Sequence, residues 1–211
     1  MIFYCLGWFV LRYLFQKVVS LPESGEMTGF VFGLYTSWLT SCELLGYATQ
    51  VDIWTVASAY YVMDIFWLFQ YPSIMNQNLM FLLHHILSLI PLTLLHWYPE
   101  GKTMFYVFFL LAEITNPIQQ CFALWKRHYN RAVAWQYQMF VVLSTWYTFL
   151  YISIRVITWP ILLYFWTNTR QFDQFSLEIA RVLQIVVVLL IFGSYIWSYR
   201  LARGWVKLVS P

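Results

Sequence analysis

Seven apolar segments follow one another along the chain, and each is about as long as a bilayer-spanning helix. They cover Ile2–Val19, Thr28–Leu45, Ile53–Gln70, Leu79–Trp97, Met104–Trp125, Gln136–Phe165 and Leu177–Tyr199. A helix needs about 17–25 residues to cross roughly 30 Å of hydrocarbon, and the sixth segment is long enough to tilt or to bend at Pro160. The breaks carry turn residues, the first of them Pro22-Glu23-Ser24-Gly25. This pattern predicts an all-α, polytopic membrane helix bundle of about seven transmembrane helices.

The composition favours a membrane protein as well. Of the 211 residues, 61% are hydrophobic and 10% are charged, whereas an average soluble domain is about 25% charged. Such a chain cannot cover its apolar surface with polar groups in water. The breaks are short and no linker or internal repeat separates them, so we expect residues 1–211 to form a single transmembrane domain. A six-span alternative, in which Ile2–Val19 lies in the membrane interface, stays open.

Basic residues outside the segments gather on one side of the predicted membrane. With seven spans, one side receives Lys17, Lys126, Arg127, Arg131, Arg200, Arg203 and Lys207, and the other side receives Lys102 and Arg170. Because Lys and Arg are enriched in cytoplasmic loops, this distribution predicts a cytoplasmic C-terminus and an N-terminus outside the cytoplasm. Every later loop keeps its side in the six-span alternative.

Two adjacent histidines, His84 and His85, lie inside the fourth segment. An ionisable side chain at membrane depth loses its water and needs a partner inside the protein, which makes the pair a candidate functional site. The alternative is that one imidazole only hydrogen-bonds a neighbouring helix, while the other, about 100° away, faces the headgroups. Adjacent histidines diverge on a helix, so we expect no metal site.

Polar side chains also recur at helical spacing in other segments. They are Tyr60 and Asp64 in the third, His84 and Ser88 in the fourth, Glu113, Asn116 and Gln120 in the fifth, and Ser144, Thr148, Tyr151 and Arg155 in the sixth. Such faces should turn toward one another rather than toward lipid.

The depth of these groups predicts which of them meet. At 1.5 Å per residue, Asp64 and the two histidines all lie about 8–9 Å inside the cytoplasmic edge. We therefore expect Asp64, His84, His85 and Glu113 to line one cavity, where a carboxylate orients an imidazole for acid–base chemistry. The alternative is a polar network that only fixes helix register. For Glu113 and Arg155, a mutually neutralising ion pair carries equal weight.

Taken together, several short motifs resemble the TLC-domain family, the lipid-handling membrane fold of the ceramide synthases and related proteins. They are His84-His85, Tyr60-Tyr61-Val62-Met63-Asp64, Ala112-Glu113-Ile114-Thr115-Asn116-Pro117, Arg155 with Pro160, and Ile196-Trp197-Ser198-Tyr199. The resemblance covers nearly the whole chain and implies a six-helix core, here with one further helix. In the ceramide synthases, two histidines and two downstream aspartates are implied in acyl transfer from acyl-CoA to a sphingoid base. Here Glu113 and Asn116 stand at the aspartate positions, and asparagine cannot exchange a proton.

Two functional hypotheses follow from this resemblance. The first, closer to the TLC-domain-containing subgroup than to the synthases, is a multi-pass membrane protein of lipid metabolism that binds or regulates membrane lipids in a polar-floored pocket. The second is an acyl-CoA-dependent acyltransferase of ceramide synthase type, with acyl-CoA as cosubstrate and no other cofactor. We assign catalytic roles to His84, His85 and Glu113, and lipid or substrate contact to Tyr60, Asp64, Ser88, Asn116, Gln120 and Arg155.

The family also implies the surroundings of the protein. We expect its partners to be membrane lipids of fatty acyl or sphingoid type and not nucleic acid, while a homo-oligomer stays open. The implied location is the endoplasmic reticulum or a neighbouring membrane of the secretory pathway.

Overall fold

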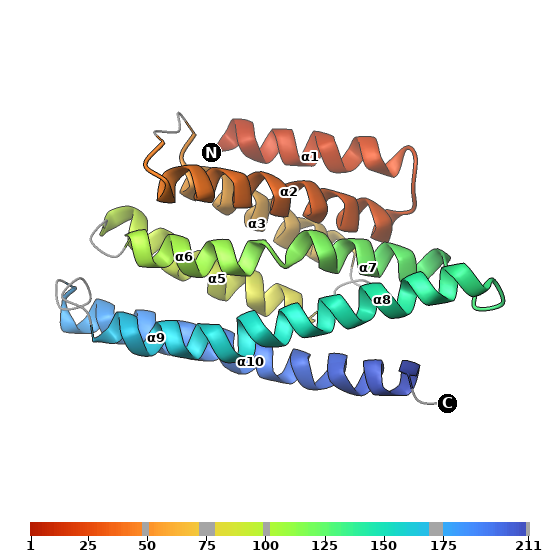
Figure 1. Ribbon diagram of the computed structural model, residues 1–211. Coiled ribbons are helices and arrows are strands. Elements are labelled where there is room, and N and C mark those ends of the chain that lie inside the picture. The colour runs from red at the N-terminus through yellow and green to blue at the C-terminus, as the bar shows by residue number, and fades with distance from the viewer. Residues whose placement is uncertain (48–50, 72–78, 99–101, 169–174, 210–211) are drawn as a thin grey trace.

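The regular structure of the described chain is entirely helical. The computed structural model describes residues 1–47, 51–71, 79–98, 102–168 and 175–209. Its helices are α1 (Ile2–Gln16), α2 (Leu21–Leu44), α3 (Ile53–Gln70), α5 (Leu79–Trp97), α6 (Lys102–Glu113), α7 (Asn116–His128), α8 (Ala134–Tyr151), the π-helix η2 (Ile152–Thr158), α9 (Trp159–Thr167) and α10 (Leu177–Val209). Figure 1 shows them lying side by side along one long axis, with α1 at one edge of the bundle and α10 at the opposite edge. The predicted all-α bundle is thereby confirmed.

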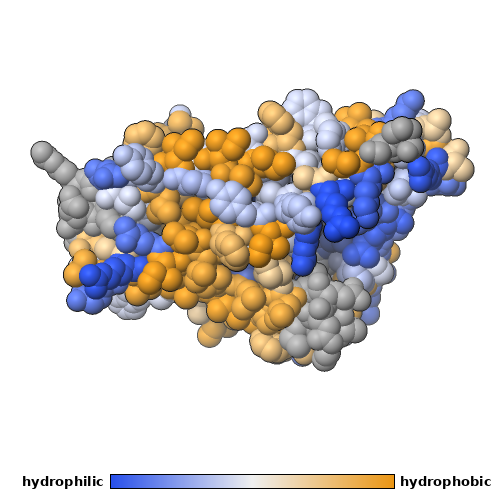
Figure 2. All heavy atoms as spheres, turned by 90° about the horizontal axis from the view of Figure 1, so that it is seen from below, coloured by the Kyte–Doolittle hydropathy of each residue, from blue (hydrophilic) through white to orange (hydrophobic). Residues whose placement is uncertain are grey.

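Three long stretches are apolar enough to cross a membrane, namely Lys102–His128, Ala134–Thr167 and Leu177–Val209. Ile2–Gln16 and Leu79–Leu94 are apolar but shorter. Figure 2 shows hydrophobic atoms over the middle of one face and hydrophilic atoms toward its two ends, as a membrane-embedded surface requires. These features indicate an integral membrane protein. The helices α2 and α3 are not among these apolar spans, because their small and polar residues lower the mean hydropathy.

The start of α2 differs from the sequence-based expectation. The stretch Pro22-Glu23-Ser24-Gly25 was expected to be a turn, but it forms the first helical turn after Leu21. Proline is tolerated there because the first N–H groups of a helix have no intrahelical partner. The backbone N–H of Ser20 donates to Glu23 Oε2 at 2.8 Å, and Ser24 Oγ donates to the carbonyl of Leu21 at 2.7 Å. This capping geometry outweighs the turn preference of Pro and Gly.

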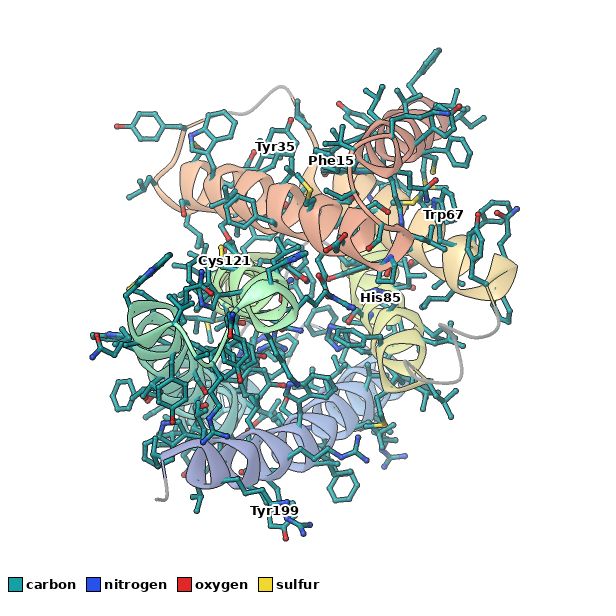
Figure 3. All side chains as sticks on the ribbon, turned by 90° about the vertical axis from the view of Figure 1, so that its right-hand side faces the viewer. Phe15, Tyr35, Trp67, His85, Cys121 and Tyr199 are labelled. Atoms are coloured by element: carbon teal, nitrogen blue, oxygen red, sulfur yellow. The ribbon has the colours of Figure 1, made fainter. Side chains whose placement is uncertain are left out.

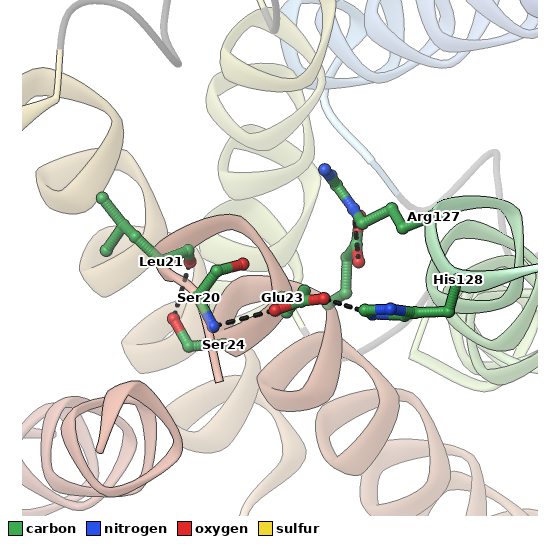
Figure 4. Close-up of polar contacts among 7 residues, drawn as sticks. Ser20, Leu21, Glu23, Ser24, Arg127 and His128 are labelled. Atoms are coloured by element: carbon green, nitrogen blue, oxygen red, sulfur yellow. Dashed lines mark hydrogen bonds and ion pairs between the residues drawn. The ribbon is translucent and has the colours of Figure 1, made fainter. Parts of the chain in front are cut away.

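Ion pairs join the N-terminal end of α2 to the C-terminal end of α7 (Figure 4). Glu23 contacts the His128 imidazole, and Glu26 accepts hydrogen bonds from Arg127 Nη2 at 2.7 Å and from Arg127 Nε at 3.1 and 3.2 Å. The hydrogen bonds from Ser20, together with the contact to His128, lower the pKa of Glu23 to about 2. A carboxylate near a helix N-terminus and a cation near a helix C-terminus are both favourable with respect to the helix dipoles.

We expect Glu23→Gln to lower the thermal midpoint of unfolding at neutral pH, and the difference from wild type to shrink in acid. A carboxylate with a lowered pKa stabilises the folded state above its unfolded pKa. That contribution disappears as the pH falls from the ordinary value of 4.5 toward 2. Thermal unfolding in detergent across this range measures the effect, with Glu178→Gln at the exposed start of α10 as the control. A difference that stays constant down to the lowest pH would contradict this assignment.

Two predicted single helices are interrupted. The fifth segment breaks between α6 and α7 at Ile114 and Thr115, two residues before Pro117, which has no N–H for the carbonyl one turn earlier. The sixth segment was expected to bend at Pro160. It instead widens into η2 before that proline, and Thr158 Oγ1 donates to the carbonyl of Ser153, five residues earlier, at 2.8 Å. Such π-helical turns are frequent at functional sites, and both interruptions lie next to the polar groups described below.

The helix α2 packs against α1, α6 and α7, although it is rich in hydroxyl and glycine residues. Three of its buried hydroxyls bond to carbonyls of their own helix: Thr28 to Ser24, Thr36 to Phe32 and Thr40 to Thr36, at 2.6–2.7 Å. These polar side chains are therefore satisfied without water. The small side chains bring the backbone of α2 close to its neighbours, as in other membrane helix contacts.

Candidate functional site

The carboxylate of Asp64 on α3 lies between two basic side chains. His85 Nε2 is 2.8 Å from Asp64 Oδ2, and Arg12 Nη1 donates to Asp64 Oδ1 at 2.5 Å. Arg12 and His85 are only 6% exposed. Figure 3 looks along the bundle and shows His85 in its interior, whereas Tyr199 points away from it. The similar depth expected for Asp64 and the histidines thus corresponds to a direct contact between Asp64 and His85.

A second polar cluster surrounds Glu113 at the end of α6, where the chain is interrupted. Tyr61 Oη donates to Glu113 Oε1 at 3.0 Å, and Asn116 Nδ2 donates to Oε2 at 2.6 Å. Both oxygens of this buried carboxylate are thereby hydrogen-bonded. Asn116 acts here as a hydrogen-bond donor to the acid.

Arg155, in η2, lies near Glu113 but is bound differently from the expectation. No ion pair joins the side chains of these two described residues; Arg155 Nη2 instead donates to the carbonyl of Ala112 at 2.9 Å. Its guanidinium also lies 4.6 Å from the ring centroid of Trp159. Arg155 therefore stabilises the interrupted end of α6, where Thr115 Oγ1 donates to the same carbonyl at 2.7 Å.

A partly open cavity of about 50 Å³ lies beside these clusters, lined by residues of α3, α5, α6, α9 and α10. Its polar lining residues are Tyr61, His84, Ser88 and Glu113, and its apolar lining residues are Pro91, Phe105, Phe108, Phe109, Ala112, Trp159, Trp166, Val187 and Leu190. The cavity thus combines apolar walls with a small polar region supplied by three helices.

The two histidines have different surroundings. His84 lines the cavity and makes no hydrogen bond to another described residue, whereas His85 is bound to Asp64 and does not line the cavity. The expectation that Asp64, His84, His85 and Glu113 all line one cavity is therefore wrong for Asp64 and His85. They lie behind its wall because Tyr61 stands between them and the cavity: the Tyr61 ring stacks on His85 with centroids 4.9 Å apart.

Other predicted contact residues lie away from the cavity. Tyr60 is buried and stacks on Phe32 with ring centroids 3.8 Å apart. Gln120 lies over Gly29 of α2, where an added Cβ would be 2.9 Å from Gln120 Nε2 and 3.2 Å from Tyr60 Oη. These two side chains belong to the contact of α2 with α3 and α7. The polar residues of the sixth segment, Ser144, Thr148, Tyr151 and Arg155, are all buried, so this face does turn inward.

Sequence reasoning missed two residues of the site. Arg12 was not predicted to belong to the site, although an arginine inside an apolar run is itself a signal for a buried partner. Tyr60 was predicted to contact the ligand and Tyr61 was not. Tyr61 precedes Asp64 by three residues, however, and so lies on the same helical face.

No protein-family model matches this chain, and it has no significant match among curated proteins or among solved structures.

Proposed function

We propose that the protein is a multi-pass membrane protein of lipid metabolism that binds or regulates membrane lipids by holding part of a lipid in this cavity. The observation that carries the proposal is that the cavity wall combines mostly apolar side chains with the polar side chains of Tyr61, His84, Ser88 and Glu113. Ligand sites commonly combine an apolar lining with a few polar groups that fix orientation. An acyl terminus fits the apolar part, and a hydroxyl or carbonyl group fits the polar part.

The proposal includes the topology, the domain type and the cellular location expected from the sequence. It comprises seven membrane spans, a TLC-type domain, a cytoplasmic C-terminus and a location in the endoplasmic reticulum or a related membrane. A cysteine introduced at Arg131, between α7 and α8, tests the orientation. We expect a membrane-impermeant maleimide to label it only from the cytoplasmic side, and labelling from the opposite side would reject this topology.

Filling the cavity tests lipid binding. Leu190→Trp places a larger side chain in the cavity wall, whereas Leu189→Trp changes the neighbouring residue of α10, which is 45% exposed and does not line the cavity. We expect the protein purified from membranes to carry a tightly bound lipid after delipidating washes, as measured by mass spectrometry. Leu190→Trp should lose most of that lipid and Leu189→Trp should retain it. Equal retention in both variants would argue against a lipid in this cavity.

The second candidate is the acyl-CoA-dependent acyltransferase. It is favoured by one observation: His84 faces the cavity without a hydrogen-bond partner among the described residues, which leaves a ring nitrogen available to accept a proton from a bound substrate. Purified protein given acyl-CoA and a long-chain base should then release CoA, and His84→Ala should abolish the release. We expect little or no release, because Asn116 cannot replace a titratable acid and a positioned acid or base is worth about 10²–10⁴ in rate. Robust His84-dependent release would reverse this order of the two candidates.

A further inference from the structure

A groove opens on the surface of the bundle between α9 and α10, at the edge opposite α1 (Figure 1). Its volume is about 480 Å³, which is in the range of small-molecule sites. Its lining includes Pro160, Leu163 and Thr167 of α9, and Gln184, Val188 and Tyr195 of α10. None of its lining residues also lines the cavity described above. Hydrophobic atoms cover the middle of this side of the molecule (Figure 2), so the groove faces the acyl region of the bilayer.

The charged residues of α10 indicate where this helix enters the hydrocarbon. Arg181 and Arg200 bound the stretch 182–199, which contains no Asp, Glu, Lys or Arg. At 1.5 Å per residue this stretch is roughly 27 Å long, close to the thickness of about 30 Å of a hydrocarbon core. Arg181 therefore lies at one edge of the hydrocarbon, Gln184 lies just inside that edge, and Ile191 lies near the midplane.

The groove runs from this edge to the middle of the membrane. At its inner end Tyr195 Oη donates to the carbonyl of Val156 at 3.3 Å. The same number of residues separates Val156 from Thr167 as separates Gln184 from Tyr195, so Thr167 and Gln184 lie level at the outer end of these antiparallel helices. From Gln184 to Tyr195 the groove is roughly 16 Å long, about half of the hydrocarbon thickness. Its length therefore matches the acyl region of a single leaflet.

Two polar side chains at the outer end have no partner within the described protein. The half-buried amide of Gln184 makes no hydrogen bond to another described residue, although an amide inside the hydrocarbon is costly without one. Arg181 lies one helical turn closer to the membrane edge, is exposed, and forms no ion pair with a described acid. The protein thus offers a cation at the level of the lipid phosphates, and below it an amide donor at the level of the ester carbonyls.

We infer that this groove is a binding site for one glycerophospholipid of the leaflet in which α10 begins. Arg181 contacts the phosphate, Gln184 donates to an ester carbonyl, and one acyl chain lies between α9 and α10 toward Tyr195. A transmembrane helix of another chain fits less well, because close helix contacts need small residues, whereas this groove is lined by larger ones such as Leu163 and Val188. The inference depends on the membrane embedding of α10 and not on the lipid proposed for the cavity.

Native mass spectrometry of the full-length, delipidated protein tests the two polar contacts. Phosphatidylglycerol is compared with diacylglycerol of the same chains, which has the ester carbonyls but no phosphate. Arg181→Gln should weaken binding of phosphatidylglycerol about fivefold, the usual contribution of one interfacial basic residue, and should leave diacylglycerol binding unchanged. Gln184→Leu should weaken binding of both lipids about three- to tenfold, as expected for the loss of one hydrogen bond. Phosphatidylglycerol binding that is equal in wild type and both variants would overturn the inference.

Filling the groove tests where the acyl chain lies. Val188 and Leu189 are 52% and 45% exposed, and only Val188 lines the groove. Val188→Trp should therefore abolish binding of the single phosphatidylglycerol, and Leu189→Trp should retain it.

Two results of this comparison would overturn the inference. One is phosphatidylglycerol binding that is lost in Leu190→Trp, which fills the cavity, and retained in Val188→Trp. The other is a dimer in the same spectra that Val188→Trp dissociates, because a second copy of the chain would then occupy the groove. A cavity without lipid would reject the proposed function and leave the result for the groove unchanged.

Discussion

Replacing Asp64 with alanine should lower the free energy of unfolding by about 3–5 kcal/mol, because it leaves a buried guanidinium without its counter-ion. Arg12 is only 6% exposed and is held in place by Asp64 and Trp67. Equilibrium unfolding in mixed micelles measures the loss.

An exposed ion pair provides the matched control for Asp64→Ala. Glu26 pairs with Arg127, whose side chain is 45% exposed, and Glu26→Ala should cost no more than about 1 kcal/mol. The double variant Arg12→Leu with Asp64→Leu should be more stable than the sum of the two single losses predicts, because neither charge is then left unpaired. A loss below about 1 kcal/mol for Asp64→Ala would show that the pair does not anchor α1.

Gly33→Ala should cost about 1–3 kcal/mol, the usual range for overpacking a tight helix contact. An added Cβ at Gly33 would lie 2.9 Å from Pro117 Cδ and 3.0 Å from Asn116 Cβ. Both atoms lie close to the backbone of α7, so neither can move without the helix. Because Asn116 bonds to Glu113, the strain should also disturb the polar wall of the cavity.

A second glycine separates this effect from helix propensity. Gly193 lies inside α10, and a Cβ there would meet nothing within 4 Å. Gly193→Ala should therefore leave stability unchanged or raise it by roughly 0.5–1 kcal/mol, the gain expected for Ala over Gly in a helix. If both glycine variants behave alike, the close contact between α2 and α7 does not carry the predicted cost.

The sequence predicted the helices best where their ends coincide with the ends of apolar runs. Ile53–Gln70 and Leu79–Trp97 agree with α3 and α5 at both ends. The start of α2 could not be found this way, since Pro22 and Gly25 resemble a turn. The capping-box spacing of Ser20 and Glu23, whose contact the structure shows, is the sequence signal that marks this helix start. Likewise α10 continues to Val209, because a helix does not end where its sequence becomes basic.

Part of the candidate site could be predicted from depth and helical periodicity. These two features bring Asp64 to His85, and Glu113 to Asn116 on one face. Rotation of a helix about its own axis, however, is set by packing, which a single sequence does not reveal. This rotation determines that His84, and not His85, lines the cavity. Arg155 illustrates the same limit. Its hydrogen-bond partner is the carbonyl of Ala112 at the helix break, and not the oppositely charged side chain of Glu113.

Mapping the contact of a bound acyl chain tests the central claim most directly. A fatty acid with a diazirine near its terminus would be photolysed on purified protein, and the modified peptides would be identified by mass spectrometry. We predict labelling within Phe105–Glu113 and Trp159–Trp166, which contribute most of the apolar wall. We also predict that Leu190→Trp suppresses it and Leu189→Trp does not. Labelling confined to exposed outer residues such as Phe149 and Phe192, with no effect of Leu190→Trp, would contradict the proposal that the cavity holds a lipid.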